Sequence, residues 1–358
     1  ADAQKSLRAY IEQARAKGQL LKKLDTPPGG FFVAPTVIRV DGIEELSREV
    51  FGPVLHVACY SGKVLAKVVE SINAKGFGLT LGLHTRIDSR VQEVIDLAQV
   101  RNLYVNRDQI GAVVGSQPFG GERLSGTGPK AGGPLYLPRF RKRIEDTTDR
   151  YALTRHSGPT IGCEKLRDTI AALKRDDWAN MTDRMDILRE VLDGQQADAL
   201  AAAATIVSDP RTLPGPTGES NQYWLAPKGV VLCLGSDANV LMSQSIQALA
   251  AGNRVVVVGP AEITKRIEPL QEAGVPIGAL TGKVEPQALV DSLIDLVTFA
   301  GQKEDLGSLR KALADRQGAI LSLVMDKISP ESYCHERSVC IDTTATGGNV
   351  SLLTLQAS

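Results

Sequence analysis

The sequence lacks the features that mark membrane, nucleic-acid-binding and secreted proteins. No apolar run approaches the roughly 20 residues that a membrane helix needs, so we expect no transmembrane segment. Lys plus Arg equal Asp plus Glu, 41 against 41, so no net field attracts nucleic acid or an anionic membrane. The N-terminus opens with a polar amphipathic stretch and not with the basic start and apolar block of a secretory signal. From the balanced charge we expect no nucleic-acid binding by this segment.

Cysteine is scarce and scattered. The five cysteines stand at positions 59, 163, 233, 334 and 340, with no Cys-x-x-Cys pair. An odd number without a spacing pattern indicates reduced thiols in a cytoplasmic protein, and not a disulfide framework. The four histidines do not cluster with the cysteines. No metal site is predicted.

What the chain does contain is the composition of an ordinary globular protein. Its 358 residues are 43% hydrophobic and 23% charged, which suits two domains that each bury a core. Strand-like and helix-like patterns alternate over residues 54–106 and predict a parallel or mixed sheet covered by helices. The pattern breaks over residues 107–138, a Gly-rich stretch that we expect to form a long structured loop. A loop this long inside a compact domain is usually either functional or disordered.

A second alternating series follows a Pro/Gly-rich turn predicted over residues 213–221. Strand-like runs separated by helical patterns span residues 229–326 and predict a doubly wound α/β domain. The polar stretch over residues 139–159 is predicted to be a linker between the two α/β parts. The strand-like tail over residues 338–353 has no helix of its own, so it needs a sheet to pair with, in its own chain or in a neighbouring copy.

Three stretches of the sequence resemble known families. REVFGPV at residues 48–54 resembles the Glu-x-Phe-Gly-Pro motif of the aldehyde dehydrogenase superfamily. QPFGGERLSGTGPKAGGPLYL at residues 117–137 resembles the Pro-Phe-Gly-Gly-x-x-x-Ser-Gly segment of the same superfamily. The later part of that stretch is similar to the L-glutamate γ-semialdehyde dehydrogenase of bifunctional proline utilization A proteins, and TTATGGN at residues 343–349 is similar to their tail.

This resemblance implies an α/β fold in three parts. Residues 1–146 are expected to be the C-terminal half of an aldehyde dehydrogenase catalytic domain, residues 147–335 an accessory, Rossmann-like α/β domain related to the same superfamily, and residues 336–358 a strand tail for sheet pairing or oligomerisation. The resemblance also implies an upstream part of the same polypeptide and a homo-oligomer. FAD would belong to the proline dehydrogenase part, which this sequence does not contain.

By the same resemblance, Glu49 and Phe51 bind NAD. A carboxylate can accept hydrogen bonds from both ribose hydroxyls of a dinucleotide, and Glu49 matches that carboxylate, while Phe51 matches a residue that packs near the nicotinamide ring. Without the Phe-Gly-Pro that follows it, Glu49 would be interpreted as a surface helix residue beside Glu44 and Glu45. The motif favours cofactor binding.

The resemblance places the aldehyde-binding loop after the strand predicted to end at Asn106. Gly111 and Ala112 match the positions whose backbone N–H groups hold the carboxylate of glutamate semialdehyde, and glycine permits such a close approach. Phe119 matches an aromatic residue that lines the aldehyde pocket. Some relatives carry Ser in place of Ala112, so backbone alone would replace one hydroxyl contact here. The alternative for Gly111 is a glycine that serves only a tight turn.

The catalytic groups of the family are missing from this sequence. Aldehyde oxidation of this type needs a thiolate nucleophile, a carboxylate base and an Asn amide in the oxyanion hole. The Gly-Gln-x-Cys and Glu-Leu-Gly-Gly-Lys segments that carry the nucleophile and the base do not occur. Cys59 and Cys233 are each predicted to lie within a strand among apolar residues, as inert core thiols. We assign no catalytic residue to this chain.

The second α/β part resembles the start of the family's cofactor-binding domain. ALAAGNRVVVVGPAE at residues 248–262 is similar to the run that in the family ends in Lys-Pro, but Gly259 stands where that lysine contacts the adenosine ribose. Gly235, Ser236 and Asp237 replace the Trp-Asn-x-Pro element expected after the first strand. We expect this domain to keep the fold and to have lost NAD binding.

Together the motifs predict part of an NAD-dependent L-glutamate γ-semialdehyde (1-pyrroline-5-carboxylate) dehydrogenase, which oxidises the aldehyde to L-glutamate in proline catabolism. Because the nucleophile is missing, this chain alone is predicted to be inactive. The alternative is a non-catalytic assembly or oligomerisation module that completes a separate catalytic chain.

Overall fold

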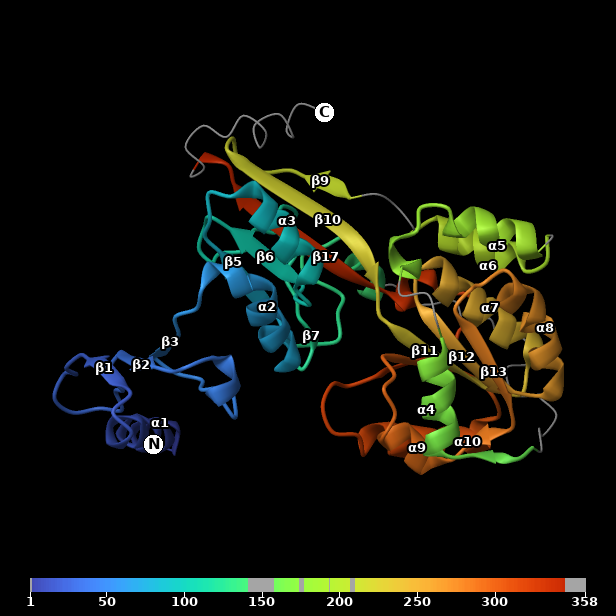
Figure 1. Ribbon diagram of the computed structural model, residues 1–358, viewed down its shortest axis with the longest axis horizontal. Coiled ribbons are helices and arrows are strands. Elements are labelled where there is room, and N and C mark those ends of the chain that lie inside the picture. The colour runs from blue at the N-terminus through green and yellow to red at the C-terminus, as the bar shows by residue number, and fades with distance from the viewer. Residues whose placement is uncertain (1, 141–157, 174–176, 193, 207–209, 345–358) are drawn as a thin grey trace. The chain divides into compact units, whose positions relative to one another are not determined.

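The computed structural model describes residues 2–140, 158–173, 177–192, 194–206 and 210–344. Contacts between residues divide the chain into two units, residues 1–76 with 92–98 and residues 77–91 with 99–358. The predicted boundary between residues 146 and 147 lies outside the described residues (Figure 1), so the division into domains stays a prediction. Within the described residues, no helix is both long enough and apolar enough to cross a membrane.

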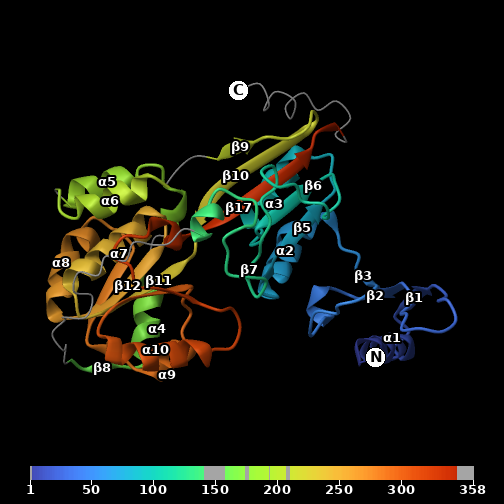
Figure 2. The same cartoon turned by 180° about the vertical axis from the view of Figure 1, so that it is seen from behind.

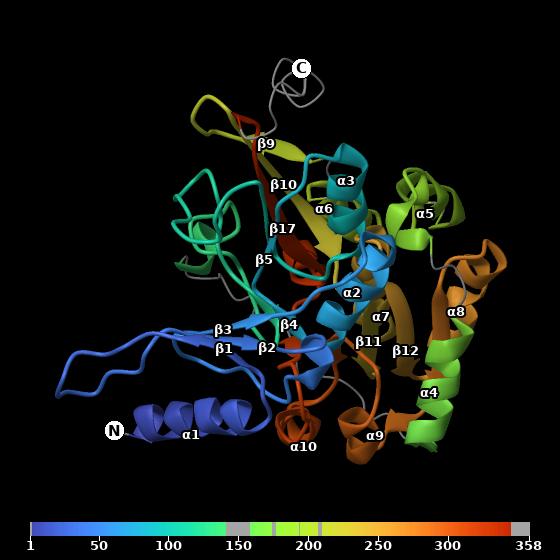
Figure 3. The same ribbon diagram turned by 60° about the vertical axis from the view of Figure 1, so that its left-hand side comes forward.

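The first unit is built on a small sheet packed against one helix. Its elements are α1 (Asp2–Ala16), β1 (Leu20–Lys23), β2 (Thr36–Arg39), η1 (Ile43–Glu45), β3 (Val54–Val57), η2 (Gly62–Val64), α2 (Leu65–Ala74) and the end of α3 (Asp88–Leu97). β2 pairs antiparallel with β1 and parallel with β3, and α1 runs alongside this sheet (Figure 3). The helical spacing of apolar residues in α1 buries Ile11 and Ala14, and Ala14 packs with Ile38 and Val40.

The second unit contains a mixed sheet that joins segments far apart in the sequence. Its strands, in spatial order, are β5 (Thr80–Leu83), β6 (Asn102–Val105), β17 (Cys334–Asp342), β10 (Glu219–Pro227) and β9 (Arg211–Leu213). β17 runs parallel to β6 and antiparallel to β10, and the two opposite views show it between them (Figures 1 and 2). The strand predicted in the C-terminal tail therefore begins earlier, at Cys334, and pairs within its own chain. Residues 345–358 of the predicted tail lie outside the described residues.

The other large sheet of this unit is parallel throughout. Its strands, in spatial order, are β13 (Ile277–Thr281), β12 (Arg254–Gly259), β11 (Val230–Gly235), β15 (Leu296–Ala300) and β16 (Ser322–Val324). The helices of the unit are α4 (Cys163–Ala172), α5 (Arg184–Leu192), α6 (Ala197–Ala204), α7 (Ala238–Ala250), α8 (Ala261–Glu272), α9 (Pro286–Val290) and α10 (Lys303–Ala314). The strand order reverses between β11 and β15, which defines a doubly wound fold. The predicted α/β class is confirmed.

Successive residues of β11 face opposite layers of helices. Val231 and Cys233 pack in a core with α5, α6, α7 and α8, whereas Leu232 and Leu234 pack in a second core with α4, α9 and α10. Because neighbouring side chains of a strand point to opposite faces, an unbroken apolar run suits a strand that is covered on both sides. Figure 1 shows helices on both faces of this sheet.

Short elements complete the second unit. β4 (Phe77–Gly78) pairs with β7 (Glu122–Arg123), β8 (Thr160–Ile161) pairs with β14 (Lys283–Val284), and three short 3₁₀ helices, η3 (Leu137–Phe140), η4 (Trp178–Asn180) and η5 (Pro330–Tyr333), connect the larger elements. The turn predicted over residues 213–221 is wrong at its end, because β10 already begins at Glu219. The nine-residue strand β10 is held by pairing with β17, a partner that local composition does not reveal.

Candidate functional site

Glu49 and Phe51 lie in the first unit, in an irregular segment between η1 and β3. The side chain of Phe51 is 87% exposed, and Glu49 is exposed as well. Glu49 makes no hydrogen bond or ion pair with any described residue, so both carboxylate oxygens are available as acceptors. Because η1 ends at Glu45, Glu49 does not lie on the helix that the alternative interpretation requires.

Gly52 fixes the turn that presents Phe51. A Cβ atom at Gly52 would lie 2.6 Å from Cδ1 of Leu7, on α1, so any other residue would have to displace that side chain. The following carbonyl, of Pro53, accepts a hydrogen bond from Thr36 N at 2.9 Å and leads the chain into β3. In the Phe-Gly-Pro motif, Gly52 thus allows the backbone to approach Leu7 closely and Pro53 leads into β3. The Phe51 ring stays on the surface.

Gly111 and Ala112 lie in the second unit, on the loop that leaves the carboxyl end of β6. Asn106 turns the chain with a left-handed φ of 57°, and its Oδ1 accepts a hydrogen bond from Thr85 N at 2.9 Å. Gly111 has a φ of 78°, and no atom of another described residue lies within 4 Å of the place that a Cβ atom would take, so backbone conformation and not crowding favours glycine there. Both residues are exposed, and their N–H groups donate to no described residue.

Phe119 lies further along the same loop, where the chain folds back on itself. Its N–H donates to Ala131 O at 3.0 Å, and Ala131 N donates to Phe119 O at 2.8 Å. The Phe119 side chain remains 36% exposed. The structure thus places Gly111, Ala112 and Phe119 on one loop of one unit, and Glu49 and Phe51 in the other unit.

A buried lysine anchors this loop to the mixed sheet. The side chain of Lys130 is 2% exposed, and its Nζ donates to Arg101 O at 2.6 Å, Asn102 Oδ1 at 2.8 Å and Ser338 Oγ at 2.6 Å. These acceptors belong to the start of β6 and to β17, and their number matches the three N–H bonds of an ammonium group. Burial nevertheless lowers the pKa of Lys130 to about 6, against the opposing effect of Glu336.

Glu336, on β17, binds both sides of the contact between the loop and the sheet. Its side chain is buried, and it accepts hydrogen bonds from Lys130 N at 2.5 Å and from the Tyr223 hydroxyl at 2.9 Å. Burial, together with the Glu336 charge, raises the pKa of Tyr223 well above its usual range. Tyr223 lies on β10, so one carboxylate connects the loop, β17 and β10.

A second group of buried charges lies beside the first. Arg101 Nε lies 2.8 Å from Glu122 Oε2, and His335 Nδ1 lies 3.1 Å from the same oxygen. Burial lowers the pKa of Arg101 to about 10, and burial raises the pKa of Glu122 despite the neighbouring Arg101. Charges this deeply buried are tolerated only when they are paired. The ion pair joins β7 to the residue directly before β6, and the contact with His335 joins β7 to β17.

Sequence reasoning missed Lys130, Tyr223 and Glu336 as members of this site. The available signal was weak: Lys130 stands alone among glycines, whereas Glu336 stands between His335 and Arg337, where a charged residue is unremarkable. Such residues are rarely buried unless they are paired. Their partners could not be identified without the pairing of β10 with β17 and of β17 with β6.

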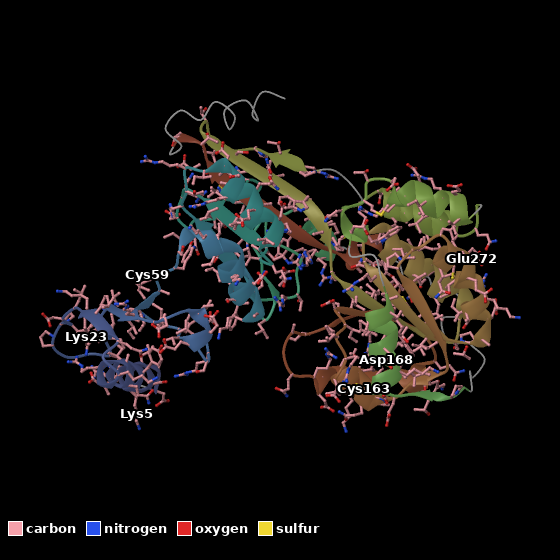
Figure 4. The ribbon with its side chains drawn as sticks, viewed as in Figure 1. Lys5, Lys23, Cys59, Cys163, Asp168 and Glu272 are labelled. Atoms are coloured by element: carbon pink, nitrogen blue, oxygen red, sulfur yellow. The ribbon has the colours of Figure 1, made fainter. Side chains whose placement is uncertain are left out.

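The cysteines differ from one another in burial. The prediction that Cys59 lies within a strand is wrong, because β3 ends at Val57 and Cys59 is exposed in the following segment (Figure 4). β3 is the short edge strand of a small sheet, so the chain leaves the sheet before Cys59. Cys233 is fully buried in β11, as predicted, and burial raises the pKa of its thiol to about 11. Among the described residues, no group of three or more His, Cys, Asp and Glu side chains could hold a metal ion.

In the doubly wound part, the chain's own groups fill the N-terminus of α7, where this fold binds phosphate. Asp237 Oδ1 accepts from Asn239 N at 2.9 Å and Val240 N at 3.0 Å. The N–H groups of Ser236 and Asp237 both donate to Ala300 O, at 2.9 and 3.2 Å. An anionic side chain thus occupies the place where a pyrophosphate would bind.

The same end of the parallel sheet holds a cavity of about 240 Å³. It is bordered by the ends of β11 and β15, including Gly235 and Phe299, and by Lys283 and Asp305. Those two charged groups lie 3.4 Å apart and pair with each other. The volume is below the roughly 300–1,000 Å³ typical of sites for drug-sized ligands, and a dinucleotide is larger still.

Comparison with models of protein families matches residues 1–142 to the aldehyde dehydrogenase family. The matched range includes the Glu49–Phe51 segment of the first unit and the loop with Gly111, Ala112 and Phe119 in the second. The first 142 residues of the chain are therefore similar to the aldehyde dehydrogenase family.

Over nearly its whole length the chain is also similar to bifunctional PutA proteins. That of Salmonella typhimurium is 39% identical over 372 aligned residues, which cover 99% of this chain and 27% of the relative, and that of Rhizobium meliloti is 34% identical over 369, covering 99% and 28%. The 1-pyrroline-5-carboxylate dehydrogenase of Bacillus subtilis is 40% identical over 131 residues, 36% of this chain and 25% of the relative. The chain thus spans about a quarter of the length of these curated relatives.

One solved structure resembles most of the chain in fold. The structure of Proline Utilization A (PutA) from Corynebacterium freiburgense covers 90% of this chain, which spans 29% of that protein, with a TM-score of 0.58 at 20% identity. This likeness concerns the fold alone. It agrees with the mixed and parallel sheets described above.

Proposed function

We propose that the chain supplies the C-terminal half of an NAD-dependent L-glutamate γ-semialdehyde dehydrogenase within a longer, bifunctional polypeptide. The similarity to bifunctional PutA proteins over almost the whole chain, and to 1-pyrroline-5-carboxylate dehydrogenases over its first part, supports this proposal. The observation that carries it is the exposed carboxylate of Glu49, which bonds to no described residue, beside the exposed ring of Phe51 in an aldehyde dehydrogenase domain.

The residues of the first unit fit one end of the cofactor. NAD, when bound, accepts a hydride from the substrate. Glu49 offers two acceptor oxygens, which suit the two hydroxyls of a ribose. Phe51 offers an exposed aromatic face against which a flat ring can pack, and Gly52 holds that face outward through its close approach to Leu7.

The loop of the second unit fits the acidic end of the aldehyde. The N–H groups of Gly111 and Ala112 donate to no described residue, and Gly111 has a positive φ, so this backbone offers two donors of the kind that binds carboxylates. Phe119 adds an apolar wall on the same loop. In this proposal the chain binds and orients the substrate, while the thiolate nucleophile, the general base and the oxyanion-hole Asn come from upstream residues.

Kinetics of the polypeptide that includes the upstream residues test this division of roles. Glu49→Gln is expected to raise KM for NAD roughly tenfold and to leave KM for the aldehyde almost unchanged, because it removes charge only from the ribose acceptor. Gly111→Val is expected to raise KM for the aldehyde and to leave KM for NAD almost unchanged. Glu44→Gln, which changes another exposed carboxylate of the first unit, is expected to change neither KM. If Glu49→Gln left both constants unchanged, the proposed cofactor role would be refuted. The 358-residue chain alone is expected to show no turnover.

The accessory part is proposed to keep the doubly wound fold without binding NAD. The carboxylate of Asp237 at the N-terminus of α7 supports this, since it repels a pyrophosphate and satisfies the amides that would bind one. The cavity at the same end of the sheet is small for a dinucleotide.

One feature favours the alternative role as an assembly module. In the first unit, Phe31, Phe32 and Leu55 are 75%, 50% and 60% exposed, and large exposed apolar side chains are what a surface that binds other protein presents. Mixing the chain with the separately expressed upstream part distinguishes the two roles. Activity that appears only on mixing, and that Glu49→Gln leaves unchanged, would favour the assembly role over the cofactor role.

A further inference from the structure

Two residues of the aldehyde-binding loop reach the same carboxylate. Arg107 precedes Gly111 and Ala112 in the sequence and Gln117 follows them. Arg107 Nη1 donates to Glu219 Oε2 at 3.0 Å, and Gln117 Nε2 donates to Glu219 Oε1 at 2.9 Å. Glu219 is the first residue of β10, more than one hundred positions further along the chain.

Arg107 connects this carboxylate with the first half of the loop. The same guanidinium donates through Nε to Asp108 O at 3.2 Å and through Nη2 to Ile110 O at 3.3 Å. The Ile110 carbonyl belongs to the peptide unit whose N–H is that of Gly111. The Arg107–Glu219 ion pair is therefore coupled directly to the orientation of the amide proposed to bind the substrate.

Gln117 connects the Glu219 carboxylate with the second half of the loop. Its side chain is 4% exposed, and its Oε1 accepts a hydrogen bond from Val113 N at 3.2 Å. The carbonyl of Ala112 shares that peptide unit. The peptide units on either side of the Gly111–Ala112 pair are thus linked to Glu219. Arg107 links the unit that ends at Gly111 N, and Gln117 links the unit that begins at the Ala112 carbonyl.

Glu219 itself is well held. Its backbone lies opposite that of Asp342 where β10 and β17 pair in the mixed sheet. Its Oε1 also accepts a hydrogen bond from Asn221 Nδ2 at 2.8 Å. The side chains of Arg107 and Glu219 are only 15% and 16% exposed, so water screens the pair less than it would a surface pair. The Cys340 sulfur of β17 accepts from Arg107 Nη1 at 3.2 Å.

We propose that Glu219 is a positioning residue for substrate binding: through Arg107 and Gln117 it holds the N–H groups of Gly111 and Ala112 in the orientation that binds the aldehyde's carboxylate. This inference rests on the proposed function of that loop. Gly111 and Ala112 are exposed and have no polar side chain that could fix their backbone. A donor pair binds an anion well only when it is oriented before the anion arrives. Arg107 also neutralises Glu219, so the carboxylate does not repel the substrate.

The first measurement needs no turnover. In the 358-residue chain, Glu219→Gln is expected to speed hydrogen–deuterium exchange of amides 108–116, because the neutral amide loses the ion pair with Arg107. Gln222→Ala is the matched control, since Gln222 also lies on β10 and its side chain bonds to no described residue. Equal exchange in the wild type and Glu219→Gln would overturn the proposal. Gln117→Leu, which removes the other tether and keeps a buried apolar side chain, provides a second variant should Glu219→Gln fold poorly.

The second measurement is kinetic and uses the polypeptide that includes the upstream residues. Glu219→Gln is expected to raise KM for the aldehyde roughly tenfold while KM for NAD stays unchanged. Glu219→Asp is expected to recover part of the loss, and Arg107→Gln combined with Glu219→Gln to add little to either single change. An unchanged KM for the aldehyde would overturn the positioning role. Gly111→Val then shows which proposal is wrong. If it raises KM for the aldehyde, only the role of Glu219 is refuted; if it leaves that KM unchanged, the proposed carboxylate site is refuted as well.

Discussion

The main-chain N–H of Lys130 donates a 2.5 Å hydrogen bond to the carboxylate of Glu336, although 206 residues separate the two in the sequence. The same carboxylate accepts the Tyr223 hydroxyl. The loop that carries the predicted aldehyde contacts is therefore fixed by a strand from the far end of the chain. Several measurable consequences depend on that relationship and on the burial around it.

Removing the Glu336 carboxylate should destabilise the second unit strongly. Glu336→Ala leaves Lys130 N and the Tyr223 hydroxyl buried without an acceptor and removes the charge that faces the Lys130 side chain. We expect the free energy of unfolding to fall by about 3–5 kcal/mol, as when one partner of a buried charged network is deleted. Urea unfolding of the wild type and the variant measures this change in free energy. Tyr223→Phe, which removes one donor and leaves the carboxylate bound to Lys130, should cost only about 1 kcal/mol; a loss as large as that of Glu336→Ala would contradict the shared role of the carboxylate.

Lys130 should make stability depend on pH. The pKa of an unfolded lysine is about 10.4, and burial lowers it in the folded chain to about 6. Between these values the unfolded chain binds more protons than the folded chain, so stability rises as the pH rises. Relative to Lys130→Met, the wild type should gain up to about 1.4 kcal/mol per pH unit above pH 6. Urea unfolding of both proteins between about pH 6 and 9 measures this. A difference that stays flat with pH would mean that the three acceptors keep Lys130 charged throughout.

Two glycines of the doubly wound part should respond to alanine in opposite directions. Gly235 has a φ of 154°, and a Cβ there would collide with the backbone of Ala300, so Gly235→Ala should cost about 3 kcal/mol or more of stability. Gly307 lies within α10 with nothing within 4 Å of a Cβ, so Gly307→Ala should stabilise by about 0.5–1 kcal/mol. Thermal unfolding of the two variants checks both signs. Tolerance of Gly235→Ala would contradict the close packing of β11 against β15.

The thiols should react with a thiol reagent in an order set by burial. Cys59 is exposed, whereas Cys233, Cys334 and Cys340 are buried and burial raises each pKa, to about 11, 12 and 11. Because the thiolate is the reactive form, we expect Cys59 to be labelled in the fast phase and these three only on unfolding. Cys163 is half-buried and should react more slowly than Cys59, so Cys59→Ser should remove the fastest phase. Fast labelling of Cys340 in the native chain would contradict its place beside Arg107.

NAD binding should depend on the first unit alone. If the accessory part has lost its cofactor site, Glu49→Gln should weaken whatever NAD binding the chain shows by roughly tenfold, because Asp237 occupies the N-terminus of α7. Equilibrium dialysis against labelled NAD measures the stoichiometry. Binding that Glu49→Gln leaves at full strength but that disappears when Lys283, beside the cavity, is replaced by Met would place a cofactor in the accessory part and refute the loss.

The sequence predicts individual elements well where the signal is local. The apolar runs of β11 and β12 and the helical spacing of α1 and α7 depend on residues within one turn or one strand of each other, and all four elements are present. The pattern misses the start of β10 because Pro214, Gly215 and Pro216 dominate the residues before it. It places Cys59 in a strand because the neighbours of Cys59 are apolar, although the strand ends two residues before it.

The sequence by itself determined the α/β class, the aldehyde dehydrogenase motifs and the residues expected to contact cofactor and aldehyde, since these depend on residue type and short spacing. Only the tertiary structure decided what holds the loop that is predicted to contact the aldehyde. Lys130, Glu219 and Glu336 act through partners that lie far away in the sequence, and a charged side chain in a strand or loop gives no local sign of which distant strand will bury it. The physical reason is that pairing of β17 with β6 and β10 is a property of the whole sheet, so the contacts it creates exist only once the chain has folded.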